Sequence, residues 1–332
     1  MQKRLLKPVL YVLLALGLMA VSIFTYKTYH LLLKPMFESG EPMMIEVKPN
    51  STANALIETL LEKKLISSKH LFLSLIKFEG LAHRLKAGTY KVDPGESAMD
   101  FIHRVVAGDV IFLVFRIIDG TTFTQVVDNL KKAPFLSYKE ADNSVIQKIN
   151  SSVEGLLLAD TYNYSAGGRS DIILKLANKK LLDYLETSWQ SRSSGLPYKS
   201  SYEMLIAASI LEKETAKPLE RQLISGVIVN RLQKHMPLQM DPTVIYALGV
   251  SYTGKLSHND LTVDSPYNTY KYRGLPPTPI SMVGKLSIDT AAHPQKSDYL
   301  YFVAKGDGYH EFSKTYTEQK NAISRYLIKG NQ

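Results

Sequence analysis

Two carboxylates stand one residue apart where a long apolar run ends. The run MLIAASIL leads directly into Glu212 and Glu214, within the stretch SILEKETA (Ser209–Ala216). A carboxyl group placed in apolar surroundings has a raised pKa, which suits a general acid. Further carboxylates that could take part are Glu154, Asp160 and Asp241. The sequence therefore points to chemistry carried by carboxylates.

Other catalytic chemistries lack their motifs. The chain contains no GxSxG, Walker A, GxGxxG or HExxH pattern, and its eight histidines show no close metal-ligand spacing. It has no cysteine, which excludes disulfides, thiolate metal sites and a cysteine nucleophile. We therefore expect neither a metal nor a cofactor.

Helical periodicity does not choose between the two acids. At 100° per residue, Glu212 shares a face with Leu205 and Ala208, whereas Glu214 shares one with Ala207 and Ile210. Apolar residues on both sides are typical of a buried helix. Either carboxylate would be partly desolvated there, so the residues alone leave the choice open.

The elements that must position these acids are mainly helical. Apolar spacing predicts a helix from residue 171 to about 192, and an amphipathic helix over 219–236 after a break at Pro218. Residues 299–319 predict a strand, a Gly-Asp-Gly turn and a second strand. With 332 residues, 45% of them hydrophobic and 21% charged, the chain is long enough for two or three folded domains.

The N-terminus predicts a membrane segment. An uncharged run over residues 8–26 follows three cations in residues 1–7. Crossing a bilayer takes roughly 20 apolar residues, with a lower limit of about 17. The leading cations favour a cytoplasmic N-terminus and place the rest of the chain outside the cytoplasm. The alternative is a cleaved signal peptide with a site near Ala20-Val21-Ser22.

Net charge does not indicate nucleic-acid binding. The chain carries +9, but residues 1–35 hold five cations and no acid, so the remainder carries +4. No basic stripe is interleaved with aromatic residues, and nucleic acid is therefore not an expected partner. The residual positive charge suits an anionic polymer or lipid surface.

A strand–turn–helix pattern recurs three times within residues 43–130. The copies span Ile45–Leu60, Tyr90–Val105 and Phe115–Leu130. Each contains a hydroxyl residue placed to cap the helix; these residues are Thr52, Ser97 and Thr122. The unit resembles the opening half of LysM, a small glycan-binding module. Two interpretations stay open: the region binds sugar, or it only holds a catalytic domain away from the membrane.

Several long segments together resemble a known enzyme family. They are AASILEKETA, VIVNRLQKHMPLQMDPTVIYALG, PYNTYKYRGLPPTPIS and TAAHPQKSDYLYFVAKGDGYHEFS. In this order they are similar to the endolytic murein transglycosylases, the MltG or YceG-like family, and the likeness covers essentially the whole chain. It implies an α+β fold with a transmembrane helix, a LysM-like α+β region and a mixed α+β catalytic domain over residues 150–330.

The resemblance also implies the reaction and its catalyst. The enzyme would cleave the β-1,4 bond between MurNAc and GlcNAc within nascent peptidoglycan strands, leaving 1,6-anhydroMurNAc ends and terminating strand elongation. The first glutamate of the EKETA motif, Glu212, would act as general acid and then as base. Glu214 would be its structural neighbour. The segment EGLLLADTY lacks a Trp and a Pro that the family often has, and Val283 stands where Pro is common, which affects the expected shape of the loops.

Other site residues are expected in polar, aromatic loops. Gln239 and Asp241 in QMDPT, together with Asn268 and Tyr270 in YNTY, could bind sugar hydroxyls and faces. Asp241 could instead cap a turn before a proline. Glu154 could either position substrate or accept backbone hydrogen bonds.

Two rival functions remain beside the lytic transglycosylase. A hydrolytic muramidase would pair Glu212 with Asp241 or Glu154, since ordinary glycosidases use two carboxylates. A non-catalytic envelope scaffold would bind glycan through residues 43–130. By resemblance, the expected location is the bacterial inner membrane, with the catalytic domain in the periplasm. The expected partners are peptidoglycan strands and the penicillin-binding synthases.

Overall fold

The computed structural model describes residues 3–149, 152–214 and 217–328. The chain divides into two compact units. Unit 1 comprises residues 1–113 with 164–168, and unit 2 comprises residues 114–163 with 169–332. Helices and short two-stranded sheets alternate along the described residues, so the fold is mixed α+β. The third strand–turn–helix copy, Phe115–Leu130, therefore lies entirely in unit 2.

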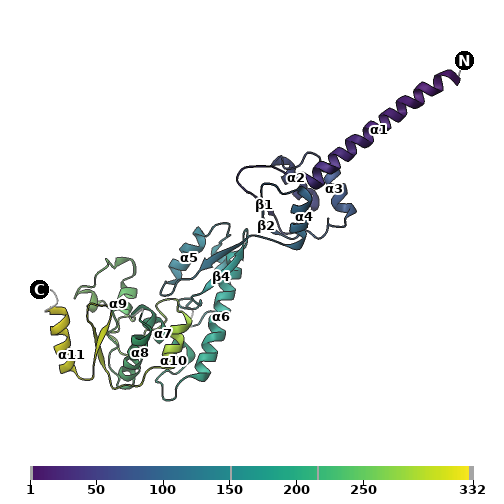
Figure 1. The fold of residues 1–332 in the computed structure, drawn as a ribbon. Helices are drawn as coiled ribbons and strands as arrows, with labels where there is room; N and C mark the ends of the chain where they lie inside the picture. The colour runs from purple at the N-terminus through teal and green to yellow at the C-terminus, as the bar shows by residue number, and fades with distance from the viewer. Residues whose placement is uncertain (1–2, 150–151, 215–216, 329–332) are drawn as a thin grey trace. The chain divides into compact units, whose positions relative to one another are not determined.

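Unit 1 begins with a long apolar helix followed by a small mixed domain (Figure 1). Its elements are α1 (Lys3–Leu33), β1 (Met43–Val47), α2 (Ala53–Glu62), α3 (Lys69–Phe78), β2 (Gly88–Val92) and α4 (Ala98–Ala107). Among the described residues, α1 alone is long and apolar enough to cross a membrane, with Tyr11–Tyr29 as its most apolar part. The residues of this part whose burial is described are almost all exposed.

The small domain of unit 1 forms around one pair of strands. β1 and β2 are antiparallel, with Ile45 opposite Tyr90, and both of these side chains are fully buried. The helices α2, α3 and α4 contribute the rest of this core, including Phe72 and Phe101. Fully burying an apolar side chain of this kind contributes roughly 1.5–3 kcal/mol. The two strands and the helices α2, α3 and α4 thus enclose one hydrophobic core.

The three predicted helix caps are confirmed. The side chains of Thr52, Ser97 and Thr122 each accept a hydrogen bond from the backbone N–H three residues later, at the start of α2, α4 and α5 (Phe123–Lys132). At α5 the side chain of Gln125 also accepts from the Thr122 N–H, which completes a capping box. Satisfying these free donors explains why the pattern predicted helix starts accurately.

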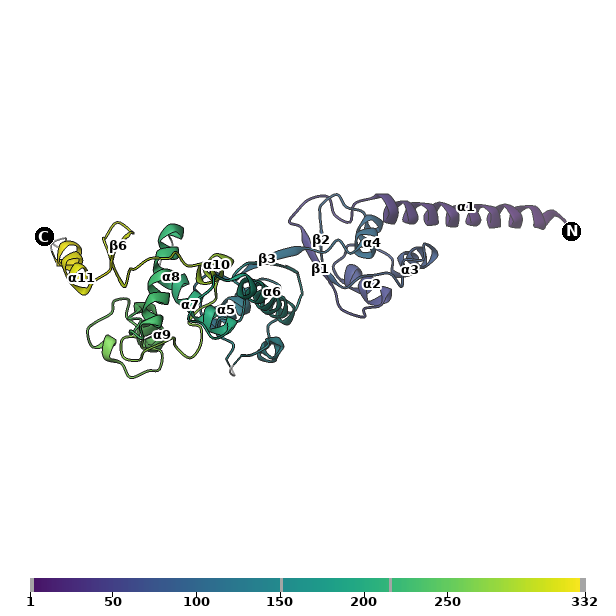
Figure 2. The same cartoon turned by 90° about the horizontal axis from the view of Figure 1, so that it is seen from below.

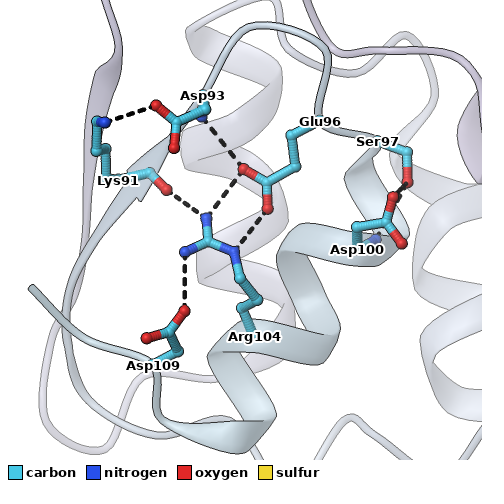
Figure 3. Close-up of polar contacts among 7 residues, drawn as sticks. All are labelled: Lys91, Asp93, Glu96, Ser97, Asp100, Arg104 and Asp109. Carbon is cyan, nitrogen blue, oxygen red and sulfur yellow. Dashed lines mark hydrogen bonds and ion pairs between the residues drawn. The ribbon is translucent and has the colours of Figure 1, made fainter.

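The segment after α1 is held firmly against unit 1. The Met36 N–H donates to the Glu96 carbonyl over 2.8 Å, and the Gly95 N–H donates to the Phe37 carbonyl over 3.0 Å. Arg104 of α4 fixes the same loop, because its guanidinium bonds both Glu96 carboxylate oxygens at 2.8 and 2.9 Å (Figure 3). The end of α1 is therefore clamped to the domain that follows it.

Unit 2 contains the apolar run and its acids. Its helices are α5, α6 (Ser170–Ser191), α7 (Ser201–Glu214), α8 (Pro218–Gln233), α9 (Asp241–Leu248), α10 (Lys285–Ala292) and α11 (Tyr316–Ile323). Its shorter helical turns are Glu140–Val145, Gly249–Ser251, Asp260–Thr262 and Ser324–Ile328. β5 (Tyr301–Ala304) and β6 (His310–Ser313) form an antiparallel hairpin. β3 (Phe112–Arg116) pairs with β4 (Thr161–Ser165), and the division between the units falls within both strands.

The helix α7 lies at the centre of unit 2. It contacts α6, α8, α9 and α10, which surround it in both views (Figures 1 and 2). Apart from Glu203, its residues from Tyr202 to Leu211 are buried. This packing on all sides confirms the buried helix that the sequence predicts. The predicted break at Pro218 is also confirmed, since α8 begins there.

Candidate functional site

Both carboxylates lie in the last turn of α7. Two residues along a helix correspond to about 200° of rotation, so their side chains leave the helix on nearly opposite sides. The structure gives them different surroundings, which helical phase alone could not reveal.

Glu212 is enclosed in an ion pair. Its Oε1 lies 3.2 Å from Nη1 of Arg221, and its Oε2 accepts the Gly284 N–H over 3.0 Å. The two side chains are only 6% and 8% exposed. Arg221 also donates to the Ser287 hydroxyl over 2.8 Å. Both oxygens of Glu212 are thus occupied by fixed donors, which is typical of a structural buried ion pair.

A second acid, Asp119, belongs to the same cluster. A Cβ added at Gly284 would lie 2.8 Å from Asp119 Oδ1 and 3.7 Å from Glu212 Oε2. Burial first and the charge of Glu212 second raise the pKa of Asp119, against the opposing effect of Arg116 and Arg221. Sequence reasoning missed Asp119, because it lies far from the EKETA motif and only the fold brings it near.

Glu214 occupies the opposite kind of environment. It is half-buried, and within residues 3–149, 152–214 and 217–328 its carboxyl group has no hydrogen bond and no ion pair. Burial raises the pKa of Glu214 to about 8, with the charge of Asp241 as the second cause. A carboxyl group with this pKa is mostly protonated at neutral pH and can donate a proton.

Asp241 and Tyr270 form a bonded pair beside Glu214. The Tyr270 hydroxyl donates to Asp241 Oδ1 over 2.5 Å. Burial, then this bond and the charge of Asp241, and then the charge of Glu214 raise the pKa of Tyr270. Glu214 at the end of α7, Asp241 at the start of α9 and Tyr270 in a loop further along the chain are thus brought close together. Asp241 lies in the first turn of α9, with Met240 at the N-cap.

Gln239 lies two residues before Asp241 in the chain. Its side chain is exposed, and its backbone φ of 53° is in the left-handed region, which is uncommon for a residue other than glycine. Its Oε1 accepts from Arg231 over 3.0 Å, and its amide nitrogen has no bond partner among the described residues and can donate to a ligand. Arg231 in turn donates to the carbonyls of Leu238 and Leu300, so it supports the loop that presents Gln239.

Asn268 is completely buried. Its amide nitrogen donates to the carbonyls of Leu261 and Val263, and its Oδ1 accepts the Tyr270 N–H over 3.0 Å. These bonds fold the loop that carries Tyr270. Substrate binding by Asn268 stays a prediction, and its surroundings favour a positioning role.

Glu154 lines a pocket of unit 2 that Lys213 and Pro242 also border. Its carboxylate accepts the Phe123 N–H over 2.9 Å and the Tyr246 hydroxyl over 3.2 Å. Burial raises the pKa of Glu154, although both bonds oppose the rise. The pocket has a volume of about 460 Å³, and Tyr246, Ile245 and Tyr252 supply apolar and aromatic walls. Both expectations for Glu154 stay open, because it accepts a backbone bond and also borders a space that a sugar could enter.

No metal site is found in the described part of the chain, where three or more His, Cys, Asp or Glu side chains do not gather in a ligand-like group. The site residues are instead a protonatable glutamate, one bonded Asp–Tyr pair and amide groups. This set can transfer a proton and bind hydroxyl groups.

Comparison with known proteins shows which family and which enzymes the chain is similar to. The YceG-like family matches residues 45–325 of the chain. The endolytic murein transglycosylase of Bacillus subtilis (strain 168) is 31% identical over 91% of this chain and 89% of its own length. The endolytic murein transglycosylase of Streptococcus pneumoniae serotype 2 is 29% identical over 75% of this chain, which spans about half (52%) of that relative.

A solved structure extends the likeness to the fold. The crystal structure of a yceG-like protein from Listeria monocytogenes aligns with a TM-score of 0.52 and 31% identity, over 85% of this chain and 99% of that one. Sequence and structure comparisons therefore agree along most of the chain, which belongs to the YceG-like family.

Proposed function

We propose that this chain is an endolytic lytic transglycosylase that cleaves the β-1,4 MurNAc–GlcNAc bond within nascent peptidoglycan strands. The names of its relatives support the reaction class. The observation that carries the chemistry is a single half-buried carboxyl group, Glu214, whose pKa of about 8 keeps it protonated at neutral pH.

In the proposed mechanism, Glu214 donates its proton to the glycosidic oxygen as the bond from that oxygen to C1 of MurNAc breaks. The Glu214 carboxylate then takes the proton of the MurNAc C6 hydroxyl, whose oxygen forms a new bond to C1. The products are a free GlcNAc hydroxyl and a 1,6-anhydro ring, and no water is consumed. Since the substrate supplies the nucleophile, one protein acid/base is sufficient.

This proposal moves the catalytic role by two residues. The family resemblance predicts Glu212 as the acid, and that assignment stays a prediction. The contacts favour Glu214, because its carboxyl group is partly exposed and has no ion-pair partner among the described residues, whereas Arg221 and the Gly284 N–H hold both oxygens of Glu212. Asp241 is proposed to help keep Glu214 protonated, while Gln239 and Tyr270 contact the sugar.

The products of the reaction test the proposal. Purified glycan strands are incubated with the full chain, and the fragments are analysed by mass spectrometry. Internal fragments that end in 1,6-anhydroMurNAc are the expected result. Reducing ends would instead support a hydrolytic muramidase, and intact strands would support a glycan-binding scaffold.

The N-terminal helix supports a membrane-anchored enzyme. We propose that α1 crosses the inner membrane once, with its N-terminus in the cytoplasm and unit 2 in the periplasm. The cations before the apolar part support this orientation. Retention of the full chain in membranes after alkaline carbonate washing tests the anchor. Termination of strand elongation beside penicillin-binding synthases stays a prediction.

The small domain of unit 1 is proposed to be LysM-like. Its order of strand, helix, helix and strand supports this assignment. A pocket of about 820 Å³ lies between the loop 47–54 and the segment 82–87, and Asn50, Thr52 and His83 are among its polar walls. Binding of soluble glycan fragments that is weakened by His83→Ala would support sugar recognition, and unchanged binding would favour a spacer role.

A further inference from the structure

A second pocket of unit 1 lies immediately after α1. It has a volume of about 430 Å³ and is formed by the segment that follows α1, by the turn after α2 and by the start of α4. Its charged wall residues, Lys34 and Lys64, are both cations, and Ser67 adds a hydroxyl group. Met36 and Leu65 are among its apolar walls. The pocket therefore combines positive charge with apolar surface.

The ammonium groups of Lys34 and Lys64 are not paired by the part of the chain that the structure describes. Within the described residues, Lys34 and Lys64 have no carboxylate partner, unlike Lys69 nearby, which pairs with Glu58 over 2.6 Å. Lys64 also has a φ of 58°, a left-handed conformation that glycine would adopt with less strain. Lysine at such a position, with its charge unpaired among the described residues, suggests a use for that charge outside the fold.

The depth of the pocket is set by α1. Lys34 stands five residues after Tyr29, where the apolar part of the helix ends. At about 1.5 Å per residue this places Lys34 about 7.5 Å beyond the apolar span. The headgroup layer on each side of a bilayer is about 5–8 Å thick. The pocket thus lies at headgroup depth if α1 spans the membrane as proposed.

The fold holds this pocket at a fixed position relative to the end of α1. The backbone bonds of Met36 and Gly95 hold the segment after α1 against the loop before α4. The Arg104 guanidinium fixes that loop through Glu96 (Figure 3). Lys34 and Lys64 are therefore carried on parts of one clamped domain rather than on a loose linker.

We propose that this pocket binds the headgroup of an anionic phospholipid, with the phosphate between Lys34 and Lys64 and the glycerol end against the apolar walls. The inference rests on the proposed membrane anchor, and it is independent of the catalytic residue. A bound headgroup would fix the height and orientation of unit 1 at the membrane surface.

The test uses the full chain in detergent micelles and native mass spectrometry with added phosphatidylglycerol or phosphatidylcholine. We expect phosphatidylglycerol to bind in preference, and Lys34→Ala with Lys64→Gly to weaken its binding roughly tenfold. Glycine suits the backbone at position 64, so this variant should remain folded, which circular dichroism would verify.

A matched control removes two other lysines of unit 1 that lie outside the apolar part of α1. Lys63→Ala with Lys77→Ala has the same net charge, but neither residue lines this pocket. Binding that is kept in the control and lost in the pocket variant supports the site. Equal losses in both variants, or no preference for phosphatidylglycerol in the wild type, would overturn it. Cleavage of soluble glycan strands by the same samples, and carbonate washing, separately report failure of the proposed activity or of the anchor.

Discussion

Glu212 and Glu214 are two residues apart and chemically identical, yet the fold places them in opposite surroundings. Glu212 is closed in by Arg221 and the Gly284 N–H, whereas Glu214 is half-buried with its charge unpaired among the described residues. Desolvation has opposite consequences in the two places. A buried carboxylate with a cation partner stabilises the fold only as part of the pair, while one without a partner becomes a weak acid.

The largest expected effect falls on the ion pair. Glu212→Gln removes the carboxylate charge that lies 3.2 Å from Nη1 of the buried Arg221 guanidinium. We expect a loss of about 3 kcal/mol in the free energy of unfolding of unit 2. Urea unfolding at pH 7, followed by fluorescence of the single tryptophan, Trp189 in α6, measures this loss.

A double variant sharpens this first prediction. Glu212→Gln combined with Arg221→Met removes both charges, so we expect it to recover much of the lost stability. Unchanged stability of the single variant would mean that the ion pair is not important for the fold.

The close packing beside Glu212 predicts the next effect. Gly284→Ala would place a methyl group 2.8 Å from Asp119 Oδ1 and 3.4 Å from its Cγ. We expect a loss of about 2 kcal/mol, measured by the same unfolding experiment. Adding Asp119→Ala should make the cost of Gly284→Ala smaller. An equal cost with and without the Asp119 side chain would contradict the proposed crowding.

Replacing Glu214 by glutamine is expected to raise the free energy of unfolding at pH 7, whereas the preceding variants lower it. Its folded-state pKa of about 8 lies above the ordinary value of 4.5, so the wild type loses stability as pH rises through this window. Glu214→Gln does not titrate, and we expect it to be about 1–2 kcal/mol more stable than the wild type at pH 7. The difference should vanish at pH 4. A destabilised variant at pH 7 would argue for a structural role instead.

The smallest expected effect concerns the neighbour of the acid. Asp241→Asn removes a negative charge near Glu214 and should lower the Glu214 pKa, although burial remains the larger cause. The alkaline limb of the pH–rate profile is expected to move to lower pH by less than about one unit. Tyr270→Phe keeps the charge of Asp241 and should shift the limb less. A limb that moves to higher pH would contradict this role of Asp241.

Local signals in the sequence predicted much of the fold. The caps at Thr52, Ser97 and Thr122 and the break at Pro218 depend on contacts within a few residues. The structure confirms all four. The predicted hairpin near the C-terminus is confirmed by β5 and β6.

The site was harder to predict because its energetics depend on distant parts of the chain. Arg221, Gly284 and Asp119 decide the environment of Glu212, and none of them is marked by a motif that points to it. The sequence predicts Asp241 and Tyr270 as loop residues that bind sugar, but their bond to each other and the effect of Asp241 on Glu214 depend on the fold. Spacing along α7 placed both acids in a desolvated helix and could not identify the partner of either.

Product analysis of the two glutamine variants side by side tests the central claim most directly. Each full-length variant, verified as folded, is incubated with glycan strands, and the initial rate of formation of 1,6-anhydroMurNAc ends is measured by mass spectrometry. We predict that Glu214→Gln lowers this rate at least about 10²-fold, as expected for loss of a general acid, while folded Glu212→Gln retains most of it. Loss of the anhydro product in Glu212→Gln with retention in Glu214→Gln would contradict the account.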